Sequence, residues 1–486
     1  MELQELNPKS VFFYFSEICK IPRASKKEEK IIAYLLDFAK QHSLDAKKDK
    51  AGNVLITKPA TAGLENRKTV VLQSHMDMVC EKNDDVDFNF DTDPIQAYVD
   101  GEWVKAKGTT LGADCGIGMA TQLAILVDKD IKHGPIECLF TVDEETGLTG
   151  AAELQPDFLT GNILLNLDSE DEGEIFIGCA GGIDTTAILP YKQEKVPTDY
   201  IALVAKVRGL KGGHSGDDIN KGLGNANKIL NRFLWRATTK YDLRISDFNG
   251  GNLRNAIARE ATAIFTIHKE DRAEIAKDFE SYSSIIKNEL KATEPELYLK
   301  LEDCPMPEFV IDETCQFDLL NALYACPHGV LAMSQEIEGL VETSTNLASV
   351  KFIHNNQIIV TTSQRSSVET AKRDAANIVT SVFRLANANV KSGEGYPGWA
   401  PNRNSEILNV AETVYTNLFS TSPAIKAIHA GLECGLFLEK YPKLDMISFG
   451  PTLRGVHSPD ERLDIASTQK FWKFLCALLE NIPRES

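Results

Sequence analysis

Hydrophobic and polar residues in the first third of the chain follow two different periodicities. Residues 27–42 (KKEEKIIAYLLDFAKQ) carry apolar side chains at helical spacing, which predicts an amphipathic helix. Short apolar runs at 69–75, 136–145 and 162–170 lack that spacing and predict buried strands, while a glycine-rich turn opens a helix over 112–128. Because strands and helices alternate, we expect an α/β fold with a central mixed sheet that helices cover on both faces.

The pattern changes between residues 187 and 390, where alternating apolar and polar positions predict strands such as 200–209 and 261–270, with helices between them. This pattern predicts one or more α+β units inserted into the first domain, and whether the two halves of the insert are related is left open. A segment rich in glycine, proline and aromatic residues at 392–402 marks the end of the insert. The predicted boundaries are 1–186 and 391–486 for the two parts of the first domain and 187–390 for the inserted domain.

Composition narrows the class of protein. With 486 residues, of which 43% are hydrophobic and 25% charged, the chain can form a large core and two domains. It carries 52 Lys and Arg residues against 70 Asp and Glu residues, so its net charge is -18. This balance argues against nucleic acid or an anionic membrane as the main partner.

Cysteine usage and hydropathy point to a compartment. The ten cysteines are scattered, with no C-x-x-C pair and no dense framework of the kind that small secreted proteins use. The N-terminal sequence has no basic region followed by an apolar core, and no apolar run approaches the roughly 18 residues that span a bilayer. We therefore expect a cytoplasmic protein without a signal peptide or a membrane span.

Acidic and imidazole side chains gather at the carboxyl ends of the predicted strands or in the turns that follow them. They are His75 and Asp77 after the first strand, Asp143, Glu144 and Glu145 after the second, Asp168 after the third, His457 after a later strand and turn, and Asp114 in the glycine-rich turn. Residues i and i+2 of an extended chain face the same way, so His75 and Asp77 are expected side by side. Open α/β sheets bind ligands outside the carboxyl ends of their strands, which makes this edge the predicted site.

Each of these residues also has a purely structural interpretation. Asp114 could cap the helix that begins near Cys115, and the run from Asp143 to Glu145 could be a solvated loop. Asp168 could cap a turn, and His457 could be an exposed loop histidine. Their joint occurrence at one sheet edge favours a functional site over these separate interpretations.

The residue types indicate a metal centre. Two imidazoles and several carboxylates, with no thiolate among them, suit a divalent ion such as Zn²⁺, with Mn²⁺ or Co²⁺ as alternatives. One catalytic zinc needs three protein ligands, so the surplus of candidates favours two ions that share a carboxylate. A thiol nucleophile at Cys115 is disfavoured, because the surrounding acids would stay unexplained and would raise the pKa of the thiol.

Five ordered motifs resemble those of the M20 metallopeptidase family: H-x-D, G-A-D-x-G-x-G, D-E-E-x-G, an aspartate after an apolar strand, and a distal histidine. The likeness covers nearly the whole chain and is closest to the branch of aminoacyl-histidine dipeptidases, also called Xaa-His or cytosol non-specific dipeptidases. It implies a phosphorylase/hydrolase-like catalytic domain formed by 1–186 and 391–486. It also implies that 187–390 is an α+β lid that recognises the substrate.

The resemblance further implies a role for each residue at the predicted edge. His75 and Asp168 would hold one ion, Glu145 and His457 would hold the other, and Asp114 would bridge the two. Asp77 would accept the second imidazole N–H of His75 and fix its tautomer. Glu144 would be the general base that takes a proton from a water bridging the metal ions.

The inserted domain carries further matches. His214 in KGGHSGDDI corresponds to the lid histidine that reaches the scissile carbonyl oxygen. Asn255 in GNLRNAIA corresponds to a substrate contact, although Ala258 replaces the proline usual in that motif. Arg365 would bind the terminal carboxylate of the substrate, the alternative being an ordinary surface arginine. Glu433 in HAGLECG would meet the substrate ammonium group.

The sequence therefore predicts a cytoplasmic two-metal dipeptidase that hydrolyses unblocked dipeptides, including those ending in histidine. Homodimer formation is left open. One alternative is an aminoacylase-type amide hydrolase of the same architecture. Another is a protein that binds metal or peptide without catalysis, but this alternative leaves Glu144 beside a metal ligand without a role.

Overall fold

The computed structural model describes residues 3–485 and contains two compact units. Unit 1 consists of the chain up to Gly178, the segment Trp399–Ala427 and the chain from Leu432 onward. Unit 2 consists of Cys179–Gly398 and Ile428–Gly431. The chain first passes into unit 2 just before strand β9 (Gly181–Pro190), which belongs to the sheet of that unit. The assignment of the two units as catalytic domain and lid stays a prediction.

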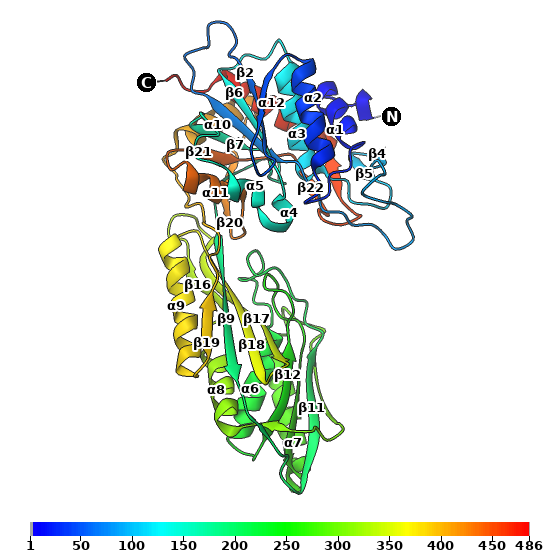
Figure 1. Cartoon of the computed structure of the whole chain (residues 1–486), viewed down its shortest axis with the longest axis vertical. Coiled ribbons are helices and arrows are strands. Elements are labelled where there is room, and N and C mark those ends of the chain that lie inside the picture. Colours follow the sequence, from blue (N-terminus) through cyan, green and yellow to red (C-terminus); the bar gives the residue numbers. More distant parts are fainter. Residues whose placement is uncertain (1–2, 486) are drawn as a thin grey trace. The chain divides into compact units, whose positions relative to one another are not determined.

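Unit 1 is built on an eight-stranded sheet with the order β1-β2-β6-β3-β7-β21-β8-β20 (Figure 1). Its strands are β1 (Asp45–Lys48), β2 (Val54–Lys58), β3 (Val70–His75), β6 (Ile136–Thr141), β7 (Ile163–Asn166), β8 (Glu174–Cys179), β20 (Ala424–Ile428) and β21 (Asp445–Ser448). β3 pairs in parallel with β6 and β7, whereas β2 pairs antiparallel with β1 and β6. The central sheet is therefore mixed, and the predicted α/β fold class is confirmed.

The three strands expected from apolar runs are β3, β6 and β7, and every residue in them is buried. Strands covered on both faces carry continuous apolar runs, which explains why the sequence revealed them. The predicted strand at 136–145 was too long at its carboxyl end. β6 stops at Thr141 because Asp143 takes a left-handed backbone conformation, with φ 50°, and a short helix begins at Glu144.

Helices pack around this sheet. They are α1 (Lys9–Ile18), α2 (Glu29–Gln41), α3 (Ala113–Val127), α4 (Glu144–Gly147), α5 (Thr149–Glu153), α10 (Glu406–Phe419), α11 (Glu433–Lys440) and α12 (Ile465–Glu480), with a 3-10 turn at Leu3–Glu5. α3 packs against β3 and α1, while α10 packs against β21 and α12. A small antiparallel sheet completes the unit, with strands β4 (Ala97–Asp100), β5 (Trp103–Ala106), β22 (Leu453–Arg454) and β23 (Arg462–Asp464).

Unit 2 is built on a nine-stranded antiparallel sheet, with β16 attached to β17 and the other strands in the order β14-β11-β13-β12-β17-β18-β9-β19. Besides β9, its strands are β11 (Tyr200–Arg208), β12 (Arg244–Gly250), β13 (Ala261–His268), β14 (Tyr298–Asp303), β16 (Gly329–Met333), β17 (Val341–Ile353), β18 (Gln357–Ser366) and β19 (Asn389–Ser392). The two strands predicted at 200–209 and 261–270 are β11 and β13, which pair with each other.

Four helices and three small elements accompany this sheet. They are α6 (Ala226–Thr238), α7 (Arg272–Glu289), α8 (Glu313–Ala325) and α9 (Glu369–Leu385), a 3-10 turn at Lys269–Asp271, and the paired strands β10 (Gln193–Glu194) and β15 (Val310–Ile311). Buried aliphatic and aromatic side chains of the sheet and these helices form one core.

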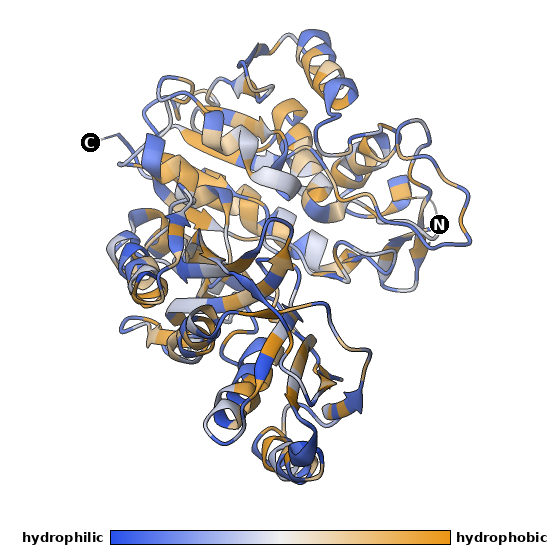
Figure 2. Ribbon diagram, turned by 60° about the horizontal axis from the view of Figure 1, so that its bottom comes forward, coloured by the Kyte–Doolittle hydropathy of each residue, from blue (hydrophilic) through white to orange (hydrophobic). Residues whose placement is uncertain are grey.

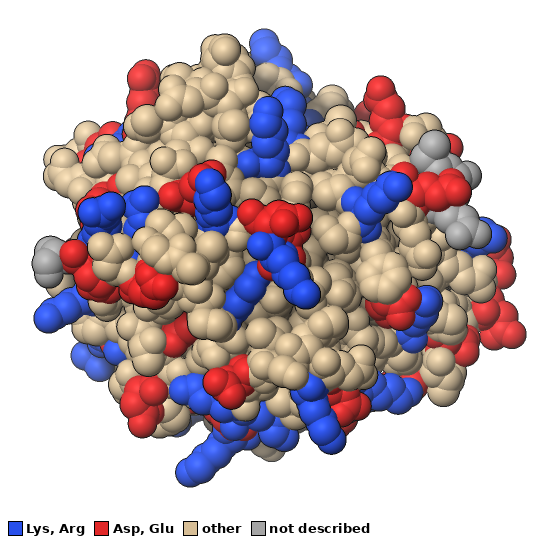
Figure 3. Space-filling model, turned by 90° about the horizontal axis from the view of Figure 1, so that it is seen from above, with Lys and Arg blue, Asp and Glu red and all other residues tan. Residues whose placement is uncertain are grey.

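The hydrophobic side chains of the helices lie mainly on one side of each helix. Figure 2 shows helices with one hydrophobic and one hydrophilic side, and α2 buries Ile31, Leu35 and Phe38 at helical spacing. On the face in Figure 3, basic and acidic side chains are interspersed rather than gathered into a patch of one sign. Within residues 3–485, no helix has both the length and the apolar character needed to cross a bilayer.

Candidate metal centre

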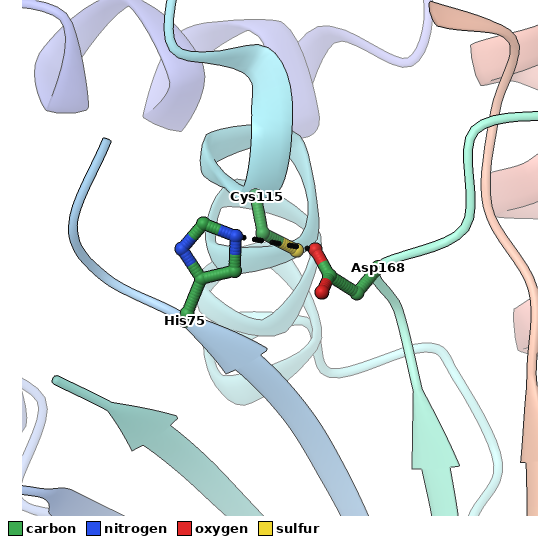
Figure 4. Close-up of side chains that lie close together, drawn as sticks. All are labelled: His75, Cys115 and Asp168. Carbon is green, nitrogen blue, oxygen red and sulfur yellow. Dashed lines mark ion pairs between the residues drawn. The ribbon is translucent and has the colours of Figure 1, made fainter. Parts of the chain in front are cut away.

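Three neighbouring parallel strands of unit 1 bring predicted site residues to one sheet edge. β3 lies between β6 and β7, and His75, its last residue, is opposite Thr141 at the end of β6. Asp168 follows β7, and Figure 4 shows it facing His75 beside Cys115, which lies at the start of α3. Nε2 of His75 lies 3.3 Å from Oδ1 of Asp168. The strand ends therefore place both side chains at the same edge.

Asp77 is fully buried on the other side of the His75 ring. Its Oδ1 lies 3.4 Å from Nδ1 of His75. Its carboxylate accepts hydrogen bonds from the N–H groups of Glu144 and Glu145 and from the hydroxyl group of Ser25. Burial alone would raise the pKa of Asp77, but the contact with His75 and these hydrogen bonds lower it to about 2. The ionised carboxylate favours the His75 tautomer that carries its proton on Nδ1 and leaves Nε2 available as a ligand.

Asp114 connects the two imidazoles. Its Oδ1 lies 3.0 Å from Nε2 of His75, and its Oδ2 lies 3.2 Å from Nε2 of His457. The N-cap of α3 is Gly112, and Asp114 has non-helical backbone angles of φ -82° and ψ 112°. Among residues 3–485, no backbone N–H group donates to its carboxylate, so Asp114 does not cap its helix.

His457 reaches the same cluster from the carboxyl-terminal part of the chain. Its side chain is 51% exposed, yet Nε2 lies 2.9 Å from Oε2 of Glu145 as well as close to Asp114. Hydrogen bonds with these two carboxylates raise the pKa of His457 to about 11. The ring is therefore partly exposed, as a loop histidine would be, but its nitrogen faces two acids.

Glu144 and Glu433 add two more carboxylates. Burial, together with Asp168 and Glu433, raises the pKa of Glu144 well above its usual range. Burial also raises the pKa of Glu433 to about 8, and its Oε2 accepts hydrogen bonds from Gln73 (2.6 Å) and Thr141 (3.0 Å). Gln73 was not predicted from the sequence, although an amide in the apolar strand two residues before His75 was a usable signal.

In each of three overlapping groups, the possible ligand atoms lie within 4.8 Å of one another. The groups are His75 with Cys115 and Asp168, His75 with Glu144 and Glu145, and Asp114 with Glu145 and His457. The Cys115 thiol lies 3.3 Å from the carbonyl oxygen of Leu167, and burial raises its pKa well above the usual range, so it stays protonated. This state disfavours the thiol nucleophile further.

Two observations show that the cluster suits a bound cation. Burial alone would lower the pKa of His75, but Asp168, Asp114 and Asp77 raise it well above its usual range, so the surroundings favour positive charge there. Oε1 of Glu145 is buried and forms no hydrogen bond with any described residue, and the buried Oδ1 of Asp168 forms none beyond its 3.3 Å ion pair with His75. Buried carboxylate oxygens are costly unless a cation meets them. Carboxylate and imidazole donors fit zinc and related divalent ions.

Unit 2 brings Arg365 and His214 together. Arg365 lies on β18 and is 7% exposed, so it is not an ordinary surface arginine. Its Nε donates to Oγ of Ser215 (3.1 Å) and its Nη1 to the hydroxyl oxygen of Tyr396 (2.8 Å). Its Nη2 lies 3.5 Å from Nε2 of His214. Ser215 and Tyr396, which hold the guanidinium group in place, were not predicted from the sequence.

Asn255 lies beside the same segment of unit 2. Its carbonyl oxygen accepts a hydrogen bond from the N–H group of Ser215 (2.8 Å), and the next residue, Ala256, forms a β-bridge with His214. A cavity of about 750 Å³ is lined by both His214 and Asn255. Ala258, which replaces the expected proline, is buried, and its carbonyl oxygen accepts a hydrogen bond from the N–H group of Ala226 (2.7 Å).

Comparison with known proteins identifies the family. A model of peptidase family M20/M25/M40 matches residues 71–481. The chain belongs to this family. It is 46% identical over 483 residues to the cytosol non-specific dipeptidase of Escherichia coli (strain K12), with 99% of each protein covered. It is also 46% identical to the aminoacylhistidine dipeptidase of Vibrio alginolyticus, whose crystal structure matches with a TM-score of 0.92 over 100% of this chain and 99% of that one.

More distant relatives share the fold. The aminopeptidase PepT of Bacillus cereus is 15% identical, with a TM-score of 0.57 over 98% of this chain and 99% of that one. The resemblance inferred from five motifs is thus confirmed. Peptidases of this family depend on metal ions, and the clusters in unit 1 are the candidate metal-binding groups of this chain. The roles of individual residues stay predictions.

Proposed function

We propose that this chain is a metal-dependent dipeptidase that hydrolyses unblocked dipeptides, including those ending in histidine. The observation that carries the proposal is the position of Asp114, whose two carboxylate oxygens face two different imidazoles at the carboxyl edge of the sheet. Nearly full-length similarity to two dipeptidases supports the substrate class. The cytosolic name of one relative supports a cytoplasmic location, and homodimer formation stays a prediction.

The proposed metal centre has two ions, most simply Zn²⁺, with Mn²⁺ or Co²⁺ as alternatives. The proposed ligands are His75 and Asp168 for one ion, Glu145 and His457 for the other, and Asp114 for both. When bound, the ions would polarise the scissile carbonyl group and lower the pKa of water in the site. Asp77 would orient His75 through its Nδ1–H group, a role supported by their 3.4 Å contact.

Glu144 is the proposed general base. Its carboxylate belongs to the same cluster as His75 and Glu145, within reach of a water molecule held there. Burial raises the pKa of Glu144, so it can keep the abstracted proton and pass it to the leaving amine. Glu433 is the proposed partner of the substrate ammonium group, because its Oε1 is buried and lacks a hydrogen bond with any residue from 3 to 485.

Unit 2 is the proposed lid. Arg365 would bind the terminal carboxylate of the substrate, and His214 would donate to the scissile carbonyl oxygen. Ser215 and Tyr396 already hold two nitrogens of the guanidinium group, which leaves Nη2 and the neighbouring His214 imidazole for substrate. Asn255 would be a further substrate contact beside them.

Turnover assays separate this function from its alternatives. We expect the purified chain, at substoichiometric concentration and loaded with Zn²⁺, Mn²⁺ or Co²⁺, to hydrolyse many equivalents of free dipeptides. Faster hydrolysis of N-acetyl amino acids than of dipeptides would instead identify an aminoacylase. Binding of dipeptides without any turnover, under all three metals, would identify a binding protein.

Metal content is a second expected result. Elemental analysis of fully active protein should give about two divalent ions per chain, because the candidate ligands exceed the three that one catalytic zinc needs. Chelation should abolish activity, and added Zn²⁺, Mn²⁺ or Co²⁺ should restore it. One tightly bound ion per chain at full activity would contradict the two-metal centre.

Arg365→Ala should act mainly on substrate binding. Loss of a charge-assisted hydrogen bond costs about 1.5–3 kcal/mol, so KM for free dipeptides should rise roughly tenfold to a hundredfold. The difference between free and carboxyamidated dipeptides should shrink, since the variant no longer distinguishes the carboxylate. Arg373→Ala, which removes an exposed arginine of α9, is the matched control and should leave KM unchanged. An unchanged preference for free dipeptides in Arg365→Ala would refute the assignment.

A further inference from the structure

The turn that carries Asp114 is held by a carboxylate from the far end of the sequence. Glu461 is 2% exposed, and it accepts hydrogen bonds from four consecutive backbone N–H groups. The donors are Leu111 (2.8 Å), Gly112 (2.9 Å), Ala113 (2.8 Å) and Asp114 (3.4 Å). Glu461 therefore holds the turn that leads into the regular part of α3, where Asp114 and Cys115 have non-helical backbone angles.

This contact fixes the backbone from which the side chain of Asp114 extends. With the N–H groups of residues 111–114 held by one buried carboxylate, the carboxylate of Asp114 lies 3.0 Å from His75 and 3.2 Å from His457. The position of the proposed bridging ligand therefore depends on a residue that contacts neither imidazole within hydrogen-bond distance.

Arg23 holds the same turn from another segment. It is 2% exposed and donates to the carbonyl oxygens of Met76 (3.1 Å), Asp77 (2.7 Å) and Gly112. It thereby joins the loop after His75 to the turn that carries the bridging ligand. A Cβ atom on Gly112 would lie 2.5 Å from its Nη2, so a glycine there leaves room for the guanidinium group.

Glu461 also shares a loop with His457. The hydroxyl group of Ser458 donates to the carbonyl oxygen of Gly455 (2.7 Å), and the N–H group of Glu461 donates to the carbonyl oxygen of Ser458 (3.0 Å). One short loop thus supplies a proposed ligand of the second ion and the carboxylate that holds the turn of the proposed bridging ligand.

We propose that Glu461 and Arg23 are positioning residues of the metal centre: they hold the turn of Asp114 so that its carboxylate faces both imidazoles. This inference rests on the ligand assignment made under the proposed function. It predicts that metal affinity depends on two residues that are not ligands.

The test is Zn²⁺ affinity measured by competition with a chromogenic chelator, a readout independent of activity. Glu461→Gln places an amide N–H₂ group against backbone N–H donors, so the turn should lose its fixed position. Changes in residues that orient metal ligands typically weaken metal binding by about 10–100-fold, and we expect a loss in that range. Arg23→Lys keeps the charge but cannot bridge both loops, and it should also weaken binding.

Glu137→Gln is the matched control. Glu137 is likewise a buried carboxylate that accepts hydrogen bonds from backbone N–H groups, those of Thr160 (3.0 Å) and Gly161 (3.1 Å). It lies near the start of β6, whereas the candidate site follows the carboxyl end of that strand. It should lower the melting temperature of the metal-free protein without changing Zn²⁺ affinity. If Glu461→Gln does not fold, Arg23→Lys decides the question alone.

The outcomes separate the inference from the function on which it rests. Zn²⁺ affinity within twofold of wild type in the folded variants would overturn the positioning role while leaving the metal centre intact. If Glu461→Gln and Glu137→Gln weakened Zn²⁺ binding equally, the loss would reflect general destabilisation, and this result would also overturn the positioning role. A wild-type chain that binds no divalent ion would instead refute the proposed function itself.

Discussion

Glu144→Gln should lower kcat by roughly 10²–10⁴-fold, the usual effect of removing a general base. The glutamine is nearly isosteric, but its amide cannot accept a proton from water. The backbone N–H group of residue 144 would still donate to Asp77, so the turn after β6 should keep its shape. Because Glu144 is not one of the five proposed ligands, the variant should retain about two metal ions by elemental analysis.

The matched control for this variant is Glu153→Gln. Glu153 is an exposed carboxylate at the end of the neighbouring helix α5, and its loss should leave the rate unchanged. Near-normal turnover in Glu144→Gln would mean that the base lies elsewhere, with Asp143 as the next candidate. Asp143 is buried, and its carboxylate already accepts hydrogen bonds from Thr146 and Thr149, which makes it the poorer base.

Much of the sheet that supports the site could be predicted because it is buried on both faces. The strand ending at His75 and its two parallel neighbours carry unbroken apolar runs, and only strands in such a sheet need them. The carboxyl end of β6 was misjudged, because apolarity does not reveal that Asp143 takes a left-handed φ of 50°. The pattern of apolar side chains therefore indicates which segments are buried better than it indicates where the backbone turns.

The residues of the candidate site also fall into two groups, those that could be predicted from the sequence and those that could not. Side chains of the candidate site could be found, because acids and imidazoles at strand ends stand out against apolar runs. Residues that hold them could not, because Arg23 and Glu461 bond to backbone atoms up to 350 residues away in sequence. Backbone carbonyl and N–H groups do not depend on the type of residue, so a hydrogen bond between a side chain and the backbone leaves no sequence motif. Tyr396, which holds Arg365 through its hydroxyl group, was hidden for a similar reason.

His214→Ala should depress kcat by roughly 10²–10³-fold, the usual effect of losing one donor to the oxyanion of a tetrahedral transition state. The imidazole lies beside Arg365, and its Nδ1 lies 3.3 Å from the N–H groups of Gly216 and Asp217. Its Nδ1 also lies 3.4 Å from Oδ2 of Asp217, and Nε2 is the nitrogen that lies beside Arg365 and that we propose to face the carbonyl oxygen of the substrate. A preset donor of this kind stabilises charge that develops only in the transition state.

KM should therefore change only modestly in His214→Ala, in contrast to Arg365→Ala, and metal content should stay at about two ions per chain. His354→Ala, which removes an exposed histidine between β17 and β18, is the matched control and should behave like wild type. Loss of metal in His214→Ala would make this histidine a ligand and would contradict the division between the catalytic unit and the lid. Unchanged kinetics would return His214 to the role of a surface loop residue, and the oxyanion would then need a donor from unit 1.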